Sequence, residues 1–219
     1  LTLVAVWFWV PPQPVGSDVN VRSELSALAR PQVWMALLVG MVGFGGMFAT
    51  YSYITPTMTE LSGFSESAVT IVLGVYGIGM TVGTVLGGRL ADRSLMGSMY
   101  GGLIAVAVVL GAFGWLAQSR PGALAAVFAM GCSASILVPA LQTRLMDVAH
   151  EGQSLAASLN HSTLNIANAL GAWLGGVVLA AGYGYEWPSR LGSGLALAGL
   201  VLAAISGLME RRGSTQVLA

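Results

Sequence analysis

Six long stretches of this 219-residue chain contain no charged residue. They cover residues 31–59, 67–88, 94–119, 121–143, 152–185 and 191–209. The hydrocarbon core of a bilayer is about 30 Å thick, and a helix rising 1.5 Å per residue crosses it with roughly 20 apolar residues. The spacing of the charges therefore predicts six membrane-spanning helices.

The composition excludes most other classes of protein. Charged residues make up 8% of the chain, whereas a soluble domain carries about 25%. A transmembrane β-barrel would need apolar and polar residues to alternate, but Leu103 to Leu110 are all apolar. We therefore expect an all-α membrane protein, a six-helix transmembrane bundle.

Several kinds of chemistry find no support in the residues. Cys132 is the single cysteine, so no intrachain disulfide and no cysteine-rich metal site is expected. The nine basic residues are spread over many segments and form no patch for nucleic acid. HExxH, GxSxG and paired intramembrane aspartates are absent from the sequence. The chain is predicted to be no enzyme and to need no metal or cofactor.

The distribution of arginines predicts the orientation. If connections alternate between the two sides, one side receives seven of the nine: Arg22, Arg30, Arg89, Arg93, Arg144, Arg211 and Arg212. The other side receives Arg120 and Arg190. Because basic residues are enriched in cytoplasmic connections, the seven-arginine side is expected to be cytoplasmic.

The same pattern divides the chain into four parts. Residues 1–12 end an apolar run at Pro11-Pro12 and are interpreted as the truncated end of another transmembrane helix. A signal peptide is the competing interpretation, but the basic start and small-residue cleavage site are missing. Residues 13–33 are expected to be a cytoplasmic linker, 34–210 the bundle, and 211–219 a cytoplasmic tail.

Glycines recur at four-residue spacing on two of the expected helices. Gly79, Gly83 and Gly87 share one face, and Gly171 and Gly175 share another. Small residues at this spacing let membrane helices approach backbone to backbone. We expect close helix packing along both faces.

Polar and aromatic side chains also form stripes inside the apolar stretches. Ser158, His161, Ser162, Asn165 and Asn168 fall within about 120° of arc at 100° per residue. A second polar stripe comprises Cys132, Ser135, Pro139, Gln142 and Thr143, and an aromatic stripe comprises Phe44, Phe48, Tyr51 and Thr55. Such stripes either line a cavity for a moderately polar organic molecule or act as interhelical contacts and lipid-facing surface. Tyr51, Gln142, His161 and Asn165 are the candidate cavity residues.

The segment GGRLADR, Gly87 to Arg93, resembles the signature loop G-x-x-x-D-R of the major facilitator superfamily. Gly88, Asp92 and Arg93 match, while Ser94 to Gly97 depart from the usual basic turn, as in the weaker second copy of the motif. Residues 52–65, 142–149 and 159–176 resemble the twelve-span drug:proton antiporter branch, especially its sugar and chloramphenicol efflux permeases.

The resemblance implies a fold, partners and a mechanism. The chain would be the C-terminal half of the major facilitator fold, two inverted three-helix repeats, in a bacterial-type inner membrane. Its partners would be an N-terminal six-span half, the lipid bilayer, a small-molecule substrate and protons. The activity would be secondary active efflux of a drug or sugar by alternating access and proton antiport.

The resemblance also implies a gate at Gly88, Arg89, Asp92 and Arg93. Asp92 would accept backbone N–H groups at a helix N-terminus while Arg89 and Arg93 pair with a neighbouring helix. The competing interpretation is a plain interfacial charge cluster. For the chain as a whole, the alternative is a self-contained six-span membrane scaffold or a homodimeric channel.

Overall fold

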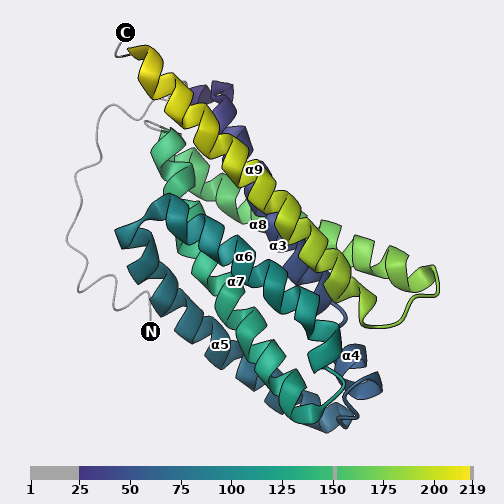
Figure 1. The fold of residues 1–219 in the computed structure, drawn as a ribbon. Helices are drawn as coiled ribbons and strands as arrows, with labels where there is room; N and C mark the ends of the chain where they lie inside the picture. Colours follow the sequence, from purple (N-terminus) through teal and green to yellow (C-terminus); the bar gives the residue numbers. More distant parts are fainter. Residues whose placement is uncertain (1–24, 150–151, 218–219) are drawn as a thin grey trace, which may run out of the picture.

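The structure, a computed structural model, describes residues 25–149 and 152–217, with only the backbone at residue 153 and residues 211–217. Within these ranges it contains helices and no strand (Figure 1). The predicted helix end at residues 1–12, residues 13–24 of the predicted linker and residues 218–219 of the predicted tail lie outside the described residues. The expectation of an all-α fold is confirmed.

Six helices in the described part of the chain are long and apolar enough to cross a membrane, as the charge-free stretches predict. They are α3 (Pro31–Tyr51), α5 (Glu66–Arg93), α6 (Leu95–Leu116), α7 (Arg120–Ala149), α8 (Gln153–Ala180) and α9 (Trp187–Val217). A short 3-10 helix, η1 (Ala27–Ala29), precedes α3, and a short helix, α4 (Ile54–Glu60), follows it. Helical structure thus extends past both ends of the predicted bundle, 34–210.

Local sequence signals set where the helices begin. The hydroxyl of Ser65 accepts a hydrogen bond from the N–H of Ala68 at 3.3 Å and caps α5. Ser94 caps α6 in the same way through the N–H of Gly97 at 3.2 Å. Pro31 is the first residue of α3, where its missing N–H leaves no helical bond unmade.

The first apolar stretch is not one continuous helix. α3 ends at Tyr51, and a turn at residues 52–53 leads into α4. Pro56 has no N–H to donate to the carbonyl four residues earlier, which disfavours a helix running through this point. Thr55, predicted to share a face with Phe44, Phe48 and Tyr51, therefore lies on a separate helix, and that part of the prediction is wrong.

The helix contacts have an internal symmetry. α5 packs mainly on α7 and α8 packs mainly on α3, while α9 contacts both α3 and α6, and α6 contacts α7. These main contacts are unchanged when α3 is exchanged with α7, α5 with α8 and α6 with α9. Since successive spans alternate in direction, the second triplet is inverted relative to the first. This arrangement confirms the expected pair of inverted three-helix repeats.

Glycine faces make the closest contacts between helices. Cβ atoms built at Gly79, Gly83 and Gly87 of α5 would overlap the backbone of α7 at Phe128, Cys132 and Ile136. A Cβ at Gly171 would overlap the backbone of α3 at Gly45 and Ala49, and one at Gly175 would contact Ala49 and Tyr53. Both predicted packing faces are confirmed, and Gly46 and Gly192 form a further contact between α3 and α9.

Gly83→Ala is expected to destabilise the bundle, whereas Gly74→Ala is not. Both substitutions raise helix propensity equally, but the methyl group at residue 83 meets the Cys132 backbone while that at residue 74 meets nothing within 4 Å. Overpacking of this kind costs about 1–3 kcal/mol. Thermal unfolding in detergent should show a lower midpoint for Gly83→Ala only, and equal midpoints would contradict the packing argument.

Candidate functional site

A cavity of about 300 Å³ lies between four of the spans. Its walls come from α3, α5, α7 and α8: Phe44, Met47, Phe48, Tyr51, Tyr76, Met80, Ala134, Ser135, Val138 and Leu164. The residues from α5, α7 and α8 all lie near the middle of their helices. The cavity therefore lies at the mid-height of these three helices rather than at one of their ends.

Two tyrosines from different helices form one side of the cavity. The rings of Tyr51 and Tyr76 are 4.9 Å apart between centroids and tilted by 34°. The Tyr76 hydroxyl donates to the sulfur of Met47 at 3.4 Å, which fixes the ring against α3. Tyr76 and Met47 are buried, while Tyr51 and Met80 are 36% and 42% exposed. Tyr51 and Met80 thus form the rim of the cavity, whereas Tyr76 and Met47 belong to its floor.

Ser135 adds further hydrogen-bonding groups to the mostly apolar floor. Its side chain is buried, and its hydroxyl makes no hydrogen bond to any described residue. Pro139, four residues later in α7, has no N–H to donate to the Ser135 carbonyl. Polar groups within a bilayer need partners, so this position is suited to contact a bound molecule or water.

The predicted polar stripe on α8 forms one exposed face. Ser158, His161, Ser162, Asn165 and Asn168 are all exposed. Ser158 and Ser162 donate to carbonyls one turn earlier, at 3.2 and 3.5 Å. The side chains of His161, Asn165 and Asn168 make no hydrogen bond to any described residue. Unpaired amides are unfavourable against lipid, so this face is suited to water or another protein surface.

The structure brings only one of the four candidate cavity residues to the cavity wall. Tyr51 lines it, whereas His161 and Asn165 lie on the exposed face of α8. Gln142 is exposed on α7 and is not among the lining residues. Their roles remain predictions, but the structure separates a cavity lined by rings and thioethers from a polar face beside it.

The motif residues are helical rather than part of a loop. Gly88, Arg89, Asp92 and Arg93 occupy the last two turns of α5, and Ser94 alone separates α5 from α6. The N-terminus of α6 is capped by Ser94, which takes the capping role expected of Asp92. Arg89, Asp92 and Arg93 are exposed and pair with no other described residue. The expected pairing of these arginines with a neighbouring helix is thus not present within the described residues.

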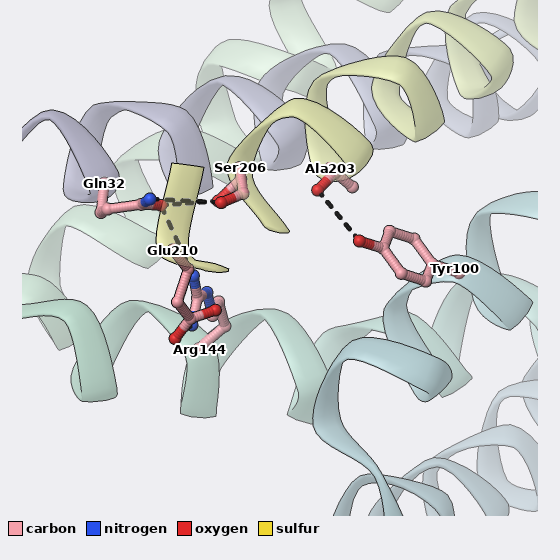
Figure 2. Close-up of polar contacts among 6 residues, drawn as sticks. All are labelled: Gln32, Tyr100, Arg144, Ala203, Ser206 and Glu210. Carbon is pink, nitrogen blue, oxygen red and sulfur yellow. Dashed lines mark hydrogen bonds and ion pairs between the residues drawn. The ribbon is translucent and has the colours of Figure 1, made fainter. Parts of the chain in front are cut away.

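A second polar cluster ties three helices together at the same end of the bundle (Figure 2). Arg144 of α7 is 4% exposed and donates through Nη1 to Oε1 of Glu210 on α9 at 2.9 Å. Its Nη2 donates to Oε1 of Gln32 on α3 at 3.4 Å, an oxygen that also accepts from the Ser206 hydroxyl at 2.7 Å. Nearby, the Tyr100 hydroxyl donates to the Ala203 carbonyl and links α6 to α9.

Sequence reasoning missed several of these residues. Tyr76 is the sole aromatic residue of the glycine-rich α5, which is a usable signal for a contact with another ring. In the sequence, Arg144 is one of the seven arginines of the predicted cytoplasmic side and lies in the segment 142–149, but neither feature indicates a partner. Its nearest acid in sequence is Asp147, but its partner is Glu210, 66 residues away. Only the tertiary structure reveals that pair.

Comparison with known proteins places the chain in a family. The model of the Major Facilitator Superfamily matches residues 1–154. The chain belongs to the Major Facilitator Superfamily. The match covers most of the chain and agrees with the six spans and the inverted triplets of helices.

Individual members of the superfamily are also similar to the chain. The inner membrane transport protein YdhP of Escherichia coli K12 is 37% identical over 94% of this chain and 53% of its own length. A chloramphenicol resistance protein of Streptomyces lividans is 30% identical over 84% of this chain and 48% of its own length. A probable sugar efflux transporter of Helicobacter pylori is 28% identical over 84% of this chain and 48% of its own length. The chain spans about half the length of these relatives.

Glu210→Ala is expected to destabilise the bundle more than Arg144→Met. The first change leaves the buried guanidinium without its carboxylate, whereas the second leaves a glutamate side chain that is 49% exposed and can be solvated. We expect a loss of about 1–3 kcal/mol for Glu210→Ala. The thermal unfolding midpoints of Glu210→Ala and Arg144→Met in detergent test this prediction. Glu60→Ala, which removes an exposed glutamate, is the control. Equal midpoints for Glu210→Ala and Glu60→Ala would contradict the role of the pair.

Proposed function

We propose that the chain is one half of a secondary active transporter that exports a small organic solute by alternating access and proton antiport. The observation that carries the proposal is the cavity between α3, α5, α7 and α8, with the exposed polar face of α8 beside it. Transporters built from inverted repeats bind substrate near the middle of the membrane, where the two halves meet.

The proposed partner is the N-terminal six-span half of the same transporter. α8 is the least buried of the six described spans, because only 22% of its most apolar 18-residue stretch is buried. Its exposed face nevertheless carries unpaired amides and an imidazole. A second six-span unit facing α8 would keep these groups away from lipid and enclose a water-filled pathway. The relatives, about twice as long as this chain, are consistent with such a partner.

We place the end of the bundle that carries Arg89, Arg93 and Arg144 in the cytoplasm of a bacterial-type inner membrane. The opposite end carries Arg120 and Arg190, and the excess of arginines on the first side follows the positive-inside rule. Gly88, Arg89, Asp92 and Arg93 would then form the cytoplasmic gate. The exposed charges of this motif are available to the other half because no described residue pairs with them.

Proton coupling is assigned to the other half. Aspartate and glutamate in the described spans lie only near the ends of the apolar segments, as with Glu66, Asp92 and Glu210. Proton pathways in membranes use ionisable side chains placed within the spans. Within this half, the residues serve substrate binding and gating, a role that requires no enzymatic chemistry.

The test is transport by the full-length protein in proteoliposomes with an imposed pH gradient. A panel of neutral aromatic compounds, sugars and organic cations should include one whose movement is saturable and driven by the gradient. Collapse of the gradient with nigericin should abolish that movement. Flux that persists without the gradient would contradict antiport, and flux that does not saturate would favour the alternative of a homodimeric channel.

Asp92→Ala is expected to reduce export without preventing membrane insertion. The carboxylate lies at the end of α5, where it stabilises no contact among the described residues, so the fold should tolerate its removal. We expect at least about a tenfold fall in the export rate, equivalent to about 1.4 kcal/mol of gating energy. Export by right-side-out vesicles, normalised to inserted protein, measures the effect, and unchanged export relative to Glu60→Ala would exclude Asp92 from the gate.

A further inference from the structure

The chemistry of the cavity wall restricts the molecule that fits it. Of the lining residues, none is charged, four are aromatic and two are methionines. A charged ligand would lose its hydration in this cavity without gaining a partner of opposite charge among the lining residues. Aromatic faces and thioether groups instead contact apolar rings favourably.

The hydrogen-bonding groups of the wall are few. Hydroxyls are present on Tyr51, Tyr76 and Ser135, and that of Tyr76 already donates to Met47. A free sugar carries a hydroxyl on nearly every carbon, and each hydroxyl buried without a partner costs about 1–3 kcal/mol. These three hydroxyls cannot pair with every hydroxyl of a sugar, but they can pair with one or two polar groups of a ligand.

Leu164 joins the cavity to the polar face of α8. It lines the cavity, and at 100° per residue His161 and Asn168 lie about 60° and 40° from it on the same side of the helix. The buried residues Thr163 and Ala167 lie on the other side of Leu164. The exposed side chains of His161 and Asn168 therefore border the cavity and offer donors and acceptors at its mouth.

We infer, on the basis of the proposed function, that the substrate is an uncharged amphiphile with an aromatic or similarly flat apolar end. The apolar end lies against the stacked rings of Tyr51 and Tyr76 and the ring of Phe48, within reach of the Ser135 hydroxyl. The polar end, carrying hydroxyl or amide groups, contacts His161 and Asn168 on α8. The substrate class is thus a lipophilic neutral compound and neither a free sugar nor an organic cation.

The test measures equilibrium binding to the full-length protein in detergent, without a pH gradient. Three radiolabelled probes represent the three chemistries: chloramphenicol for a neutral aromatic amphiphile, arabinose for a sugar and tetraphenylphosphonium for an aromatic cation. We expect chloramphenicol to bind more tightly than either of the others. Tighter binding of arabinose or tetraphenylphosphonium would overturn the inference.

Variants locate the two ends of the ligand. Tyr51→Leu should weaken chloramphenicol binding about three- to tenfold, whereas Tyr51→Phe, which keeps the ring, should change it less than about threefold. The matched control is Tyr183→Leu, since the Tyr183 ring packs at 4.7 Å from that of Trp187 near the end of α8. Equal affinities for Tyr51→Leu and Tyr183→Leu would overturn the placement of the apolar end.

Asn168→Ala should weaken chloramphenicol binding about two- to tenfold through the loss of one hydrogen bond. Gln118→Ala, which removes an exposed amide between α6 and α7, is its control and should leave binding unchanged. Equal effects of the two variants would overturn the polar contact with α8. Failure of the proposed function is distinguishable, because it would leave chloramphenicol bound at the cavity but not exported when a pH gradient is applied.

Discussion

Backbone contact between glycine faces is the interaction on which the rest of this bundle depends. Apolar side chains gain little by moving from lipid to protein, so membrane helices associate through close packing and a few polar bonds. α5 and α7 meet along Gly79, Gly83 and Gly87, where the α7 backbone occupies the space that side chains would fill. Equivalent contacts join α3 to α8 through Gly171 and Gly175. The two helix pairs occupy corresponding positions in the inverted repeats.

The same contacts explain why a cavity exists. α3 carries small residues, Gly45, Gly46 and Ala49, toward α8 and α9, whereas its Phe44, Phe48 and Tyr51 line the cavity. Helices held closely on the glycine side are kept apart on the side of the large rings. The result is a space lined by aromatic and thioether groups, with the unpaired polar face of α8 at its border.

The sequence predicted the polar and aromatic stripes because helical periodicity places residues on a face without reference to other helices. It therefore grouped Tyr51 with Phe44 and Phe48 on one face of α3, and the five polar residues on one face of α8. It could not place Gln142, because a stripe of polar residues does not specify which neighbour it meets. It also assigned a loop to Gly88, Arg89, Asp92 and Arg93, although one capping serine is enough to end α5 and begin α6.

The sequence by itself determined the membrane class, the six spans and the glycine faces, since each follows from the length, polarity and period of a local segment. The tertiary structure decided which faces meet. It stacks Tyr51 on Tyr76 and pairs Arg144 with Glu210 rather than with Asp147, its nearest acid in sequence. These contacts join different helices, and their geometry depends on the crossing of whole helices, which no local pattern specifies.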